Sequence, residues 1–294
     1  MEKIIKMTKK KPNFLIVGAA KAGTTSLAKY LNQHPDIFIP EEKELRYFVK
    51  NHLQEVSQED PSIKNILKNS ILNKDDYYAK FQVKESVRGE ASVHYLFEYE
   101  EAIPKIKEEL GDIPIIIILR KPIDRIISHV KYLNFHFNYS FNEELELEQK
   151  RIKEKYNSFW YYKSLSFYSH QIKAYMNNFS DVKVYLFEDF KNDPQTILSD
   201  IFKIFNVYDI KFDSFEVYNK SSVLKNRYKY LRKFKWIFPE KINSSLGNYF
   251  LKNLYEDKEM NVDHESILKL KNMYEDDISR LEKILGVSLE NWKK

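Results

Sequence analysis

Five short apolar runs alternate along the chain with longer segments in which apolar residues recur at helical spacing. The short runs predict β-strands at Asn13–Gly18, Asp36–Ile39, Ser86–Ala91, Ile113–Leu119 and Val182–Phe187. The helical patterns cover Thr24–Gln33, Tyr99–Leu110, Pro122–Phe135, Leu165–Asn178, Pro194–Phe205 and His264–Leu285. This alternation favours an α/β fold of three layers, in which helices flank a central, mostly parallel sheet of about five strands.

The chain divides into a short leader and one domain. Residues 1–11 hold five lysines and lack the apolar core of a signal peptide, which predicts a flexible basic leader. Residues 12–294 show no repeat, no Gly/Ser linker and no low-complexity block, so we expect a single domain. Two stretches, 51–76 and the aromatic, basic stretch after residue 213, show no clear pattern.

Composition and charge exclude several classes of function. The chain has no cysteine, which rules out disulfides, thiolate catalysis and cysteine–metal sites, and its seven histidines show no metal-ligand spacing. A net charge of +5 over 294 residues suits an anionic ligand but does not indicate a nucleic-acid partner. The longest strongly apolar run, Ile113–Leu119, is too short to cross a membrane. We therefore expect a cytoplasmic protein without a metal, and the oligomeric state stays open.

Candidate chemistry begins directly after the first predicted strand. Gly18 and Gly23 bound a turn that contains Lys21 and leads into a helix start with three hydroxyl residues. Backbone N–H groups at such a helix N-terminus bind phosphate. In the NTPase loop G-x-x-x-x-G-K-[ST] a lysine follows the second glycine, whereas Thr24 stands there in this chain. The loop therefore predicts a phosphate donor other than the γ-phosphate of ATP, with a tight turn that only permits packing as the alternative.

A second cluster follows the fourth predicted strand. Arg120 ends the strand, Pro122 suits the first position of a helix, and Ser128 lies within the first two turns of that helix. The arginine and the serine could both reach one phosphate. The alternative is that Arg120 pairs with an acidic residue and that Ser128 is an ordinary helix residue. Because the carboxyl ends of parallel strands share one edge of a sheet, we expect both clusters at the same edge.

Together the two clusters resemble the sulfotransferases that use 3′-phosphoadenosine 5′-phosphosulfate (PAPS). The first loop is similar to their 5′-phosphosulfate loop, and Arg120 with Ser128 is similar to their 3′-phosphate motif. The segment Glu42–Phe48 is similar to the K-E-x-[HR]-[FY]-F segment of carbohydrate sulfotransferases, especially the heparan sulfate type and its bacterial relatives. Further matches are Gly89–Leu96, Tyr168 with Gln171, and Leu186–Phe190 followed by Asp193 and Pro194. The resemblance covers about residues 12–235.

The resemblance implies a P-loop-like fold and a role for each matched residue. The 5′-phosphate and the sulfuryl group of the donor would be held by Lys21, Ala22, Gly23, Thr24, Thr25 and Ser26. The 3′-phosphate would be held by Arg120 and Ser128, and a later segment that closes over the nucleotide would add Lys225 and Arg227. Glu44 would be the general base, and the acceptor would contact Lys43, Arg46, Ser92 and His94.

The chemistry of sulfuryl transfer supports these roles independently. Like phosphoryl transfer, it needs in-line positioning and neutralisation of the leaving-group oxygens, which Lys21 can supply without a metal. A hydroxyl acceptor must lose a proton, and a nearby carboxylate can accept it. Spacing alone leaves Glu41, Glu42 and Glu44 open for that role, and the family pattern selects Glu44. A solvated loop charge is the alternative for each.

The chain departs from the family pattern at two positions. Many animal members have a lysine where this chain has Ala91 and a proline where it has Val93. The second catalytic lysine is therefore absent or replaced, with Lys43 and His94 as candidates. The stretch 156–168 holds seven aromatic residues, for which core packing is favoured over stacking against a sugar.

We therefore predict a sulfotransferase that moves a sulfuryl group from PAPS to a hydroxyl group, on a glycan or a small hydroxyl compound, and releases 3′-phosphoadenosine 5′-phosphate (PAP). One alternative is a nucleotide or sugar kinase, which would use ATP with Mg²⁺ and need a lysine after Gly23. The other is a non-enzymatic module that binds an anionic polymer through the basic residues between positions 220 and 235.

Overall fold

The computed structural model describes residues 9–134, 139–215, 223–224, 255–256 and 262–294. Its centre is a parallel sheet of five strands in the order β2-β3-β1-β4-β5. The strands are β1 (Phe14–Gly18), β2 (Ile37–Phe38), β3 (Val87–Ala91), β4 (Ile115–Leu119) and β5 (Val182–Leu186). Each lies within two residues of a predicted strand, so the predicted parallel sheet in an α/β fold is confirmed.

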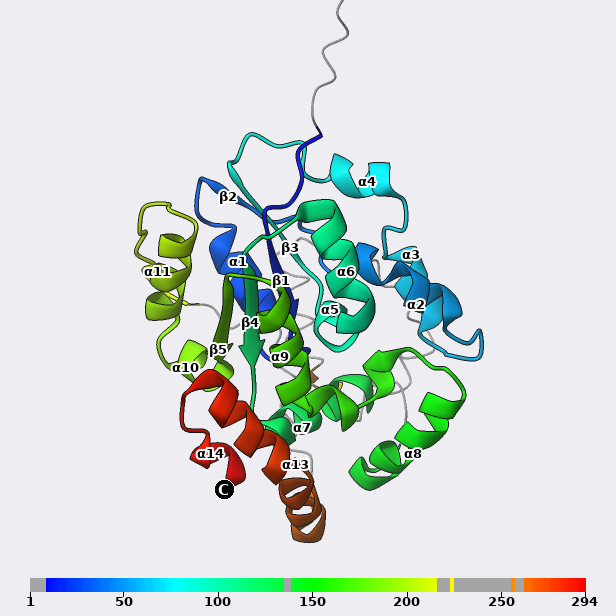
Figure 1. Ribbon diagram of the computed structural model, residues 1–294. Helices are drawn as coiled ribbons and strands as arrows, with labels where there is room; N and C mark the ends of the chain where they lie inside the picture. The colour runs from blue at the N-terminus through cyan, green and yellow to red at the C-terminus, as the bar shows by residue number, and fades with distance from the viewer. Residues whose placement is uncertain (1–8, 135–138, 216–222, 225–254, 257–261) are drawn as a thin grey trace, which may run out of the picture.

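Helices cover both faces of this sheet (Figure 1). On one side α5 (His94–Phe97), α6 (Tyr99–Leu110) and α9 (Tyr168–Asn178) pack together. On the other side α1 (Thr24–Leu31) packs with α11 (Pro194–Ile204). The remaining helices are α2 (Lys50–Glu55), α3 (Ile63–Lys68), α4 (Lys74–Ala79), α7 (Pro122–Asn134), α8 (Phe141–Lys153), α10 (Phe187–Asn192), α13 (His264–Leu285) and α14 (Glu290–Lys293). Short 3₁₀ helices cover Tyr47–Val49, Ser158–Trp160 and Ser164–Ser166. Strand β6 (Val223–Leu224) pairs antiparallel with β7 (Tyr255–Glu256).

The central strand β1 lies between β3 and β4, and all of its residues are buried. Phe14 of β1 pairs with Gly89 of β3. A Cβ atom added to Gly89 would lie 2.0 Å from the Phe14 ring, so only glycine leaves room for this ring. The pairing fixes the register of β1 against β3 and therefore the relative heights of the loops that follow them.

Helix α9 begins at Tyr168, three residues later than the predicted Leu165. The carboxylate of Asp277 in α13 accepts hydrogen bonds from the backbone N–H groups of Tyr168 (2.8 Å) and Ser169 (3.2 Å). These are the N–H groups that a helix start leaves without a partner in the helix. The acceptor comes from a residue more than 100 positions away, so no local pattern could indicate this start.

The segments that the sequence left without a pattern are short helices. Residues 51–76 form most of α2, all of α3 and the start of α4, each of six residues, which is too short to establish a helical period. The end of the predicted leader contacts this region, because Lys9 pairs with Asp75 at 2.6 Å and the backbone N–H of Lys10 donates to Gln82. Residues 9–11 therefore pack with the domain. Within the described ranges, no helix combines the length and the apolar character that crossing a membrane would require.

Candidate active site

The polar segments that follow β1, β2, β3 and β4 meet at the carboxyl edge of the sheet. Arg120, after β4, donates from Nη1 to the backbone oxygen of Lys21 at 3.1 Å. Lys43, after β2, donates from Nζ to Oγ1 of Thr25 at 3.0 Å. The next residue, Glu44, donates its backbone N–H to the carbonyl of Ala91 at the end of β3. The structure thus brings together the loops that the sequence placed at one edge.

The loop between β1 and α1 ends in a helix start that is open to an anion. Gly23 precedes α1 with a φ of 90°, which favours glycine, and a Cβ there would lie 3.0 Å from the Phe187 ring. The first turn of α1 holds no acidic residue and no side-chain cap. Thr24 is buried, whereas Thr25 and Ser26 are partly exposed. The N–H groups and the two exposed hydroxyls therefore offer donors to a phosphate.

Lys21 lies inside this loop as a largely buried cation. Its Nζ lies 4.0 Å from the centre of the Tyr132 ring. Burial, and to a smaller extent the charges of Arg120 and Arg125, lower the pKa of Lys21 to about 8. Within the described part of the chain Lys21 forms no ion pair with a carboxylate, so an anionic ligand would be its counter-ion.

Arg120 lies just before α7, and Ser128 lies inside this helix. The Arg120 guanidinium lies 4.7 Å over the Phe187 ring, and its buried Nε has no hydrogen-bond partner among the described residues. Burial lowers the pKa of Arg120, against the charges of Asp124 and Glu188. The sequence left open that Arg120 pairs with an acidic residue, and no such ion pair is found among the residues described. Ser128 is 6% exposed. Two further predicted donor residues, Lys225 and Arg227, lie outside the described residues.

The loop after β2 holds Glu44 in a fixed position. Glu44 and Arg46 have φ values of 63° and 55°, in the left-handed region that few non-glycine residues adopt. Nη1 of Arg46 donates to the backbone oxygen of Glu44 at 2.8 Å, which ties the two residues together. The Glu44 carboxylate accepts from the backbone N–H of Val93 at 3.1 Å and lies 3.5 Å from Nδ1 of His94.

These contacts set Glu44 apart from the two neighbouring glutamates. Burial raises the pKa of Glu44, but the hydrogen bond from His94 and the charges of Arg46, His94 and Lys43 outweigh it and lower the pKa to about 2. The side chain keeps 21% exposure, enough to meet a ligand. Glu41 and Glu42 are exposed, and Glu42 pairs with Lys80 at 3.0 Å. Of the three candidates, Glu44 is the carboxylate that stands among the cationic groups.

His94 connects Glu44 to the protein interior. Oδ1 of Asn157 accepts from the backbone N–H of Phe159 at 2.9 Å, and it lies 3.2 Å from Nε2 of His94. Because this oxygen has no proton to give, Nε2 of His94 must be the donor. Nδ1 then faces Nε of Arg46 at 3.3 Å and the Glu44 carboxylate at 3.5 Å. A neutral His94 accepts from Arg46, and a protonated His94 donates to Glu44.

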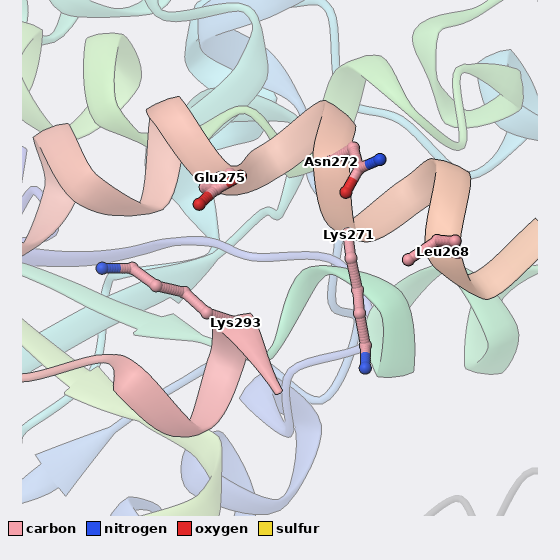
Figure 2. A pocket seen from close by; sticks show the side chains of 5 residues that line it. All are labelled: Leu268, Lys271, Asn272, Glu275 and Lys293. Atoms are coloured by element: carbon pink, nitrogen blue, oxygen red, sulfur yellow. The ribbon is translucent and has the colours of Figure 1, made fainter.

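A surface groove lies apart from these residues, between α13 and α14 (Figure 2). It is lined by Leu268, Lys271, Asn272 and Glu275 of α13 and by Lys293 of α14. The Lys293 ammonium already pairs with Glu282 and Glu290. None of the predicted site residues that the structure describes lines the groove.

Comparison with known proteins identifies the family to which the chain belongs. The sequence model of the sulfotransferase family matches residues 12–209, more than half of the chain. The chain belongs to the sulfotransferase family. A sulfotransferase crystal structure from Alicyclobacillus acidocaldarius shares 30% sequence identity with a TM-score of 0.76, over 97% of this chain and 100% of that chain. The family and this structural likeness support sulfuryl transfer by this sulfotransferase.

Two further relatives are more distant. The membrane-associated sulfotransferase kil1 of Dictyostelium discoideum is 27% identical over an alignment of 160 residues, and the match covers 48% of this chain and 30% of the relative. This chain thus matches less than a third of the length of that curated relative. The mouse sulfotransferase SULT7A1, solved in complex with PAP, is 17% identical with a TM-score of 0.48, over 92% of this chain and 84% of its own.

The structure gives Ser92 of this sulfotransferase a different surrounding from the one expected. Ser92 is fully buried, its hydroxyl donates to Glu90 at 2.5 Å, and the same oxygen accepts from the backbone N–H of Arg46 at 3.1 Å. Its burial supports a role in holding the loop of Glu44 rather than contact with an acceptor. Lys43 contacts Thr25, and Arg46 and His94 lie against the Glu44 carboxylate.

Sequence reasoning missed Glu90, the hub of a buried network beneath this loop. Its carboxylate accepts from the hydroxyls of Ser92 (2.5 Å), Tyr77 (2.6 Å) and Tyr95 (2.9 Å). Burial raises the pKa of Glu90 to about 7, although the three hydroxyls oppose the shift. The signal available in the sequence was a glutamate inside a predicted strand. The tyrosine hydroxyls that donate to this glutamate come from other elements.

We expect replacement of Glu90 by glutamine to change how stability depends on pH. The folded protein holds this proton more tightly than the unfolded chain, so lowering the pH from 8 to 5 should stabilise the wild type by up to about 3 kcal/mol through this group. Glutamine cannot titrate. The difference in unfolding free energy between the wild type and Glu90→Gln, measured in urea, should therefore be larger at pH 5 than at pH 8.

Glu109 provides a matched control for this measurement. It also accepts two tyrosine hydroxyls, from Tyr47 and Tyr78. Burial opposes the shift, but these hydroxyls and Lys74 lower the pKa of Glu109, so its stabilisation is lost as the pH falls. Glu109→Gln should therefore not show the increase at pH 5. Equal differences at both pH values for Glu90→Gln would contradict a raised pKa.

Proposed function

We propose that this sulfotransferase transfers a sulfuryl group from PAPS to a hydroxyl group of a carbohydrate and releases PAP. The observation that supports this most is the convergence of Lys21 and Arg120 at the carboxyl end of β1. Neither cation forms an ion pair with a carboxylate in the described part of the chain. The carboxylate of Glu44 lies at the same edge. Cations without an ion-pair partner, close to a carboxylate that can act as base, suit an anionic donor and a proton-bearing acceptor.

The residues present fit such a donor. PAPS supplies an activated sulfuryl group on a phosphate oxygen. Lys21 and the first turn of α1 would hold its 5′ end through Gly23 to Ser26. Arg120 and Ser128 would hold the 3′-phosphate, and within the described ranges the buried Nε of Arg120 has no hydrogen-bond partner. The predicted contacts of Lys225 and Arg227 remain part of the proposal.

The residues around Glu44 suit proton removal from the acceptor. Glu44 is ionised at any physiological pH, because its pKa is about 2. An anionic donor bound beside Glu44 would place a like charge near this carboxylate, so donor binding should raise the pKa of Glu44 and make it a stronger base. Nδ1 of His94 lies 3.5 Å from the same carboxylate and helps to hold it in place. Lys21 would stabilise the negative charge that develops on the leaving phosphate.

Aromatic rings beside Lys21 support a carbohydrate acceptor. Tyr132 is 54% exposed and lies against the Lys21 ammonium. The partly buried Phe159 ring lies 6.2 Å from Tyr132 and 5.7 Å from His94. Other aromatic residues of the stretch 156–168 are in the core, among them Trp160, Tyr162 and Tyr168. An exposed ring of this kind can pack against the apolar face of a sugar.

A thermal-shift comparison tests the nucleotide part of the proposal. PAP at a hundred times its dissociation constant should stabilise the protein by about 2.7 kcal/mol, or roughly 5 °C in Tm. ATP with Mg²⁺ and heparin should each give a smaller shift. A larger shift with ATP and Mg²⁺ would favour the kinase alternative. A shift with heparin alone, steeply reduced by salt, would favour the polymer-binding module.

A transfer assay tests the acceptor. The wild type would be incubated with ³⁵S-labelled PAPS and a mixture of glycans, and also with 2-naphthol as a simple hydroxyl compound. We expect labelled glycan. Label on 2-naphthol alone would refute the carbohydrate acceptor and leave sulfuryl transfer intact.

A further inference from the structure

Lys43 connects the loop of the proposed base to the loop of the proposed donor. It immediately precedes Glu44, yet its Nζ reaches α1 and donates to Oγ1 of Thr25 at 3.0 Å. Thr25 is in the first turn of that helix and is partly exposed. Lys43 thus lies where the two halves of the site meet.

The Lys43 ammonium has unused hydrogen-bonding capacity. It carries three N–H donors, and the hydroxyl of Thr25 is the single partner that it has among the described residues. It forms no ion pair there. Burial lowers the pKa of Lys43, the charge of Glu44 opposes this, and that of Lys29 adds to it. A shielded cation with free donors is a site for an anionic oxygen.

Thr25 points to the same ligand. Its oxygen accepts from Lys43, so its own proton stays available for a further acceptor. The charge of Lys43 polarises the hydroxyl and makes it a stronger donor. The first turn of α1 contains no acidic side chain that could take this role. An anionic group bound at the start of α1 would meet Thr25 and Lys43 together.

We propose that Lys43 binds the sulfuryl group of the donor. Of the two roles that the sequence left open for Lys43, acceptor contact and replacement of the second catalytic lysine, this assignment favours the second. This inference rests on the function proposed above. In the transfer, the S–O bond to the phosphate breaks and its electron pair stays on PAP, while a new S–O bond forms to the acceptor oxygen and the acceptor proton moves to Glu44. Lys43 would stabilise the charge on the sulfuryl oxygens throughout, beside the base, as Lys21 does for the leaving phosphate.

The proposal predicts a difference between two nucleotides that differ by the sulfuryl group alone. Calorimetric titration would measure the dissociation constants of PAPS and of PAP for the wild type and for Lys43→Met, without any acceptor. We expect Lys43→Met to weaken PAPS binding about tenfold and PAP binding less than threefold, since one charge-assisted hydrogen bond to the sulfuryl group is lost. Lys43→Arg, which keeps the charge, should retain most of the preference for PAPS.

Lys29→Met is the matched control. It removes an exposed positive charge from α1, the helix that contains Thr25. Its effect, through the general field, should be equal for both nucleotides. Equal losses of PAPS and PAP affinity in Lys43→Met, or no loss in either, would overturn the role of Lys43. A wild type that binds neither nucleotide would refute the proposed function instead. Melting curves of each variant establish that it is folded.

Discussion

Replacing Lys21 with methionine should lower kcat by about a thousandfold, the scale found when a preorganised charge on the transferred group is removed. Methionine keeps nearly the length of the lysine side chain. Like lysine, it is unbranched at Cβ and faces the same cost of the left-handed backbone, with a φ of 65°, at position 21. The loop should therefore keep its shape while the charge is lost. Steady-state rates with labelled PAPS and a sulfated product as readout would measure the effect.

The pKa of Lys21 gives this variant a second signature. With a pKa of about 8, the free wild type loses this charge as the pH rises through 8, so its affinity for PAP should fall there. In Lys21→Met the affinity should be lower at pH 7 and should no longer show this step. Lys29→Met should keep both the rate and the step. A variant with wild-type turnover would remove Lys21 from the mechanism.

Glu44→Gln should lower kcat by about a thousandfold, within the range that general acid–base catalysis contributes, and leave PAP affinity nearly unchanged. The glutamine carbonyl can still accept from the Val93 N–H, which keeps the loop in place. Because the pKa of Glu44 in the free enzyme is about 2, protonation of Glu44 should not limit wild-type kcat/KM at any pH above 4.

The neighbouring glutamates are the controls for Glu44. Glu41→Gln and Glu42→Gln make the same chemical change in the same loop, but both side chains are exposed. We expect wild-type kcat for both. If Glu44→Gln kept full turnover, Glu44 would not be the base, and His94, which shares its hydrogen bond, would be the next residue to replace.

The fold could be predicted where the evidence is local. Strand β4 is five consecutive apolar residues, and Arg120 follows it directly, so both the strand and the edge on which Arg120 lies could be inferred. The same reasoning placed Lys21 and the loop of Glu44 at that edge. The parallel topology determines where these loops meet, because the loops that follow parallel strands lie at the same edge of the sheet.

Other parts of the site depend on contacts between distant positions. Asn157 fixes the donor nitrogen of His94 from 63 residues away, and its own orientation is set by Phe159. Tyr77 satisfies Glu90 from a six-residue helix with too little periodicity to be found. The burial of Ser92 follows from this network and not from its neighbours in sequence. Single-sequence reasoning had no access to these pairings.

The lengths of the strands that support the site have a consequence for how the protein could diversify. The loop of Lys21 follows β1, a fully buried strand in the middle of the sheet, whereas the loop of Glu44 follows β2, a strand of two residues at the margin. Substitutions that shift β2 disturb few neighbours, while any that shift β1 strain both flanking strands. Under the proposed function, the position of the base can therefore drift during evolution while the loop of Lys21 stays in place.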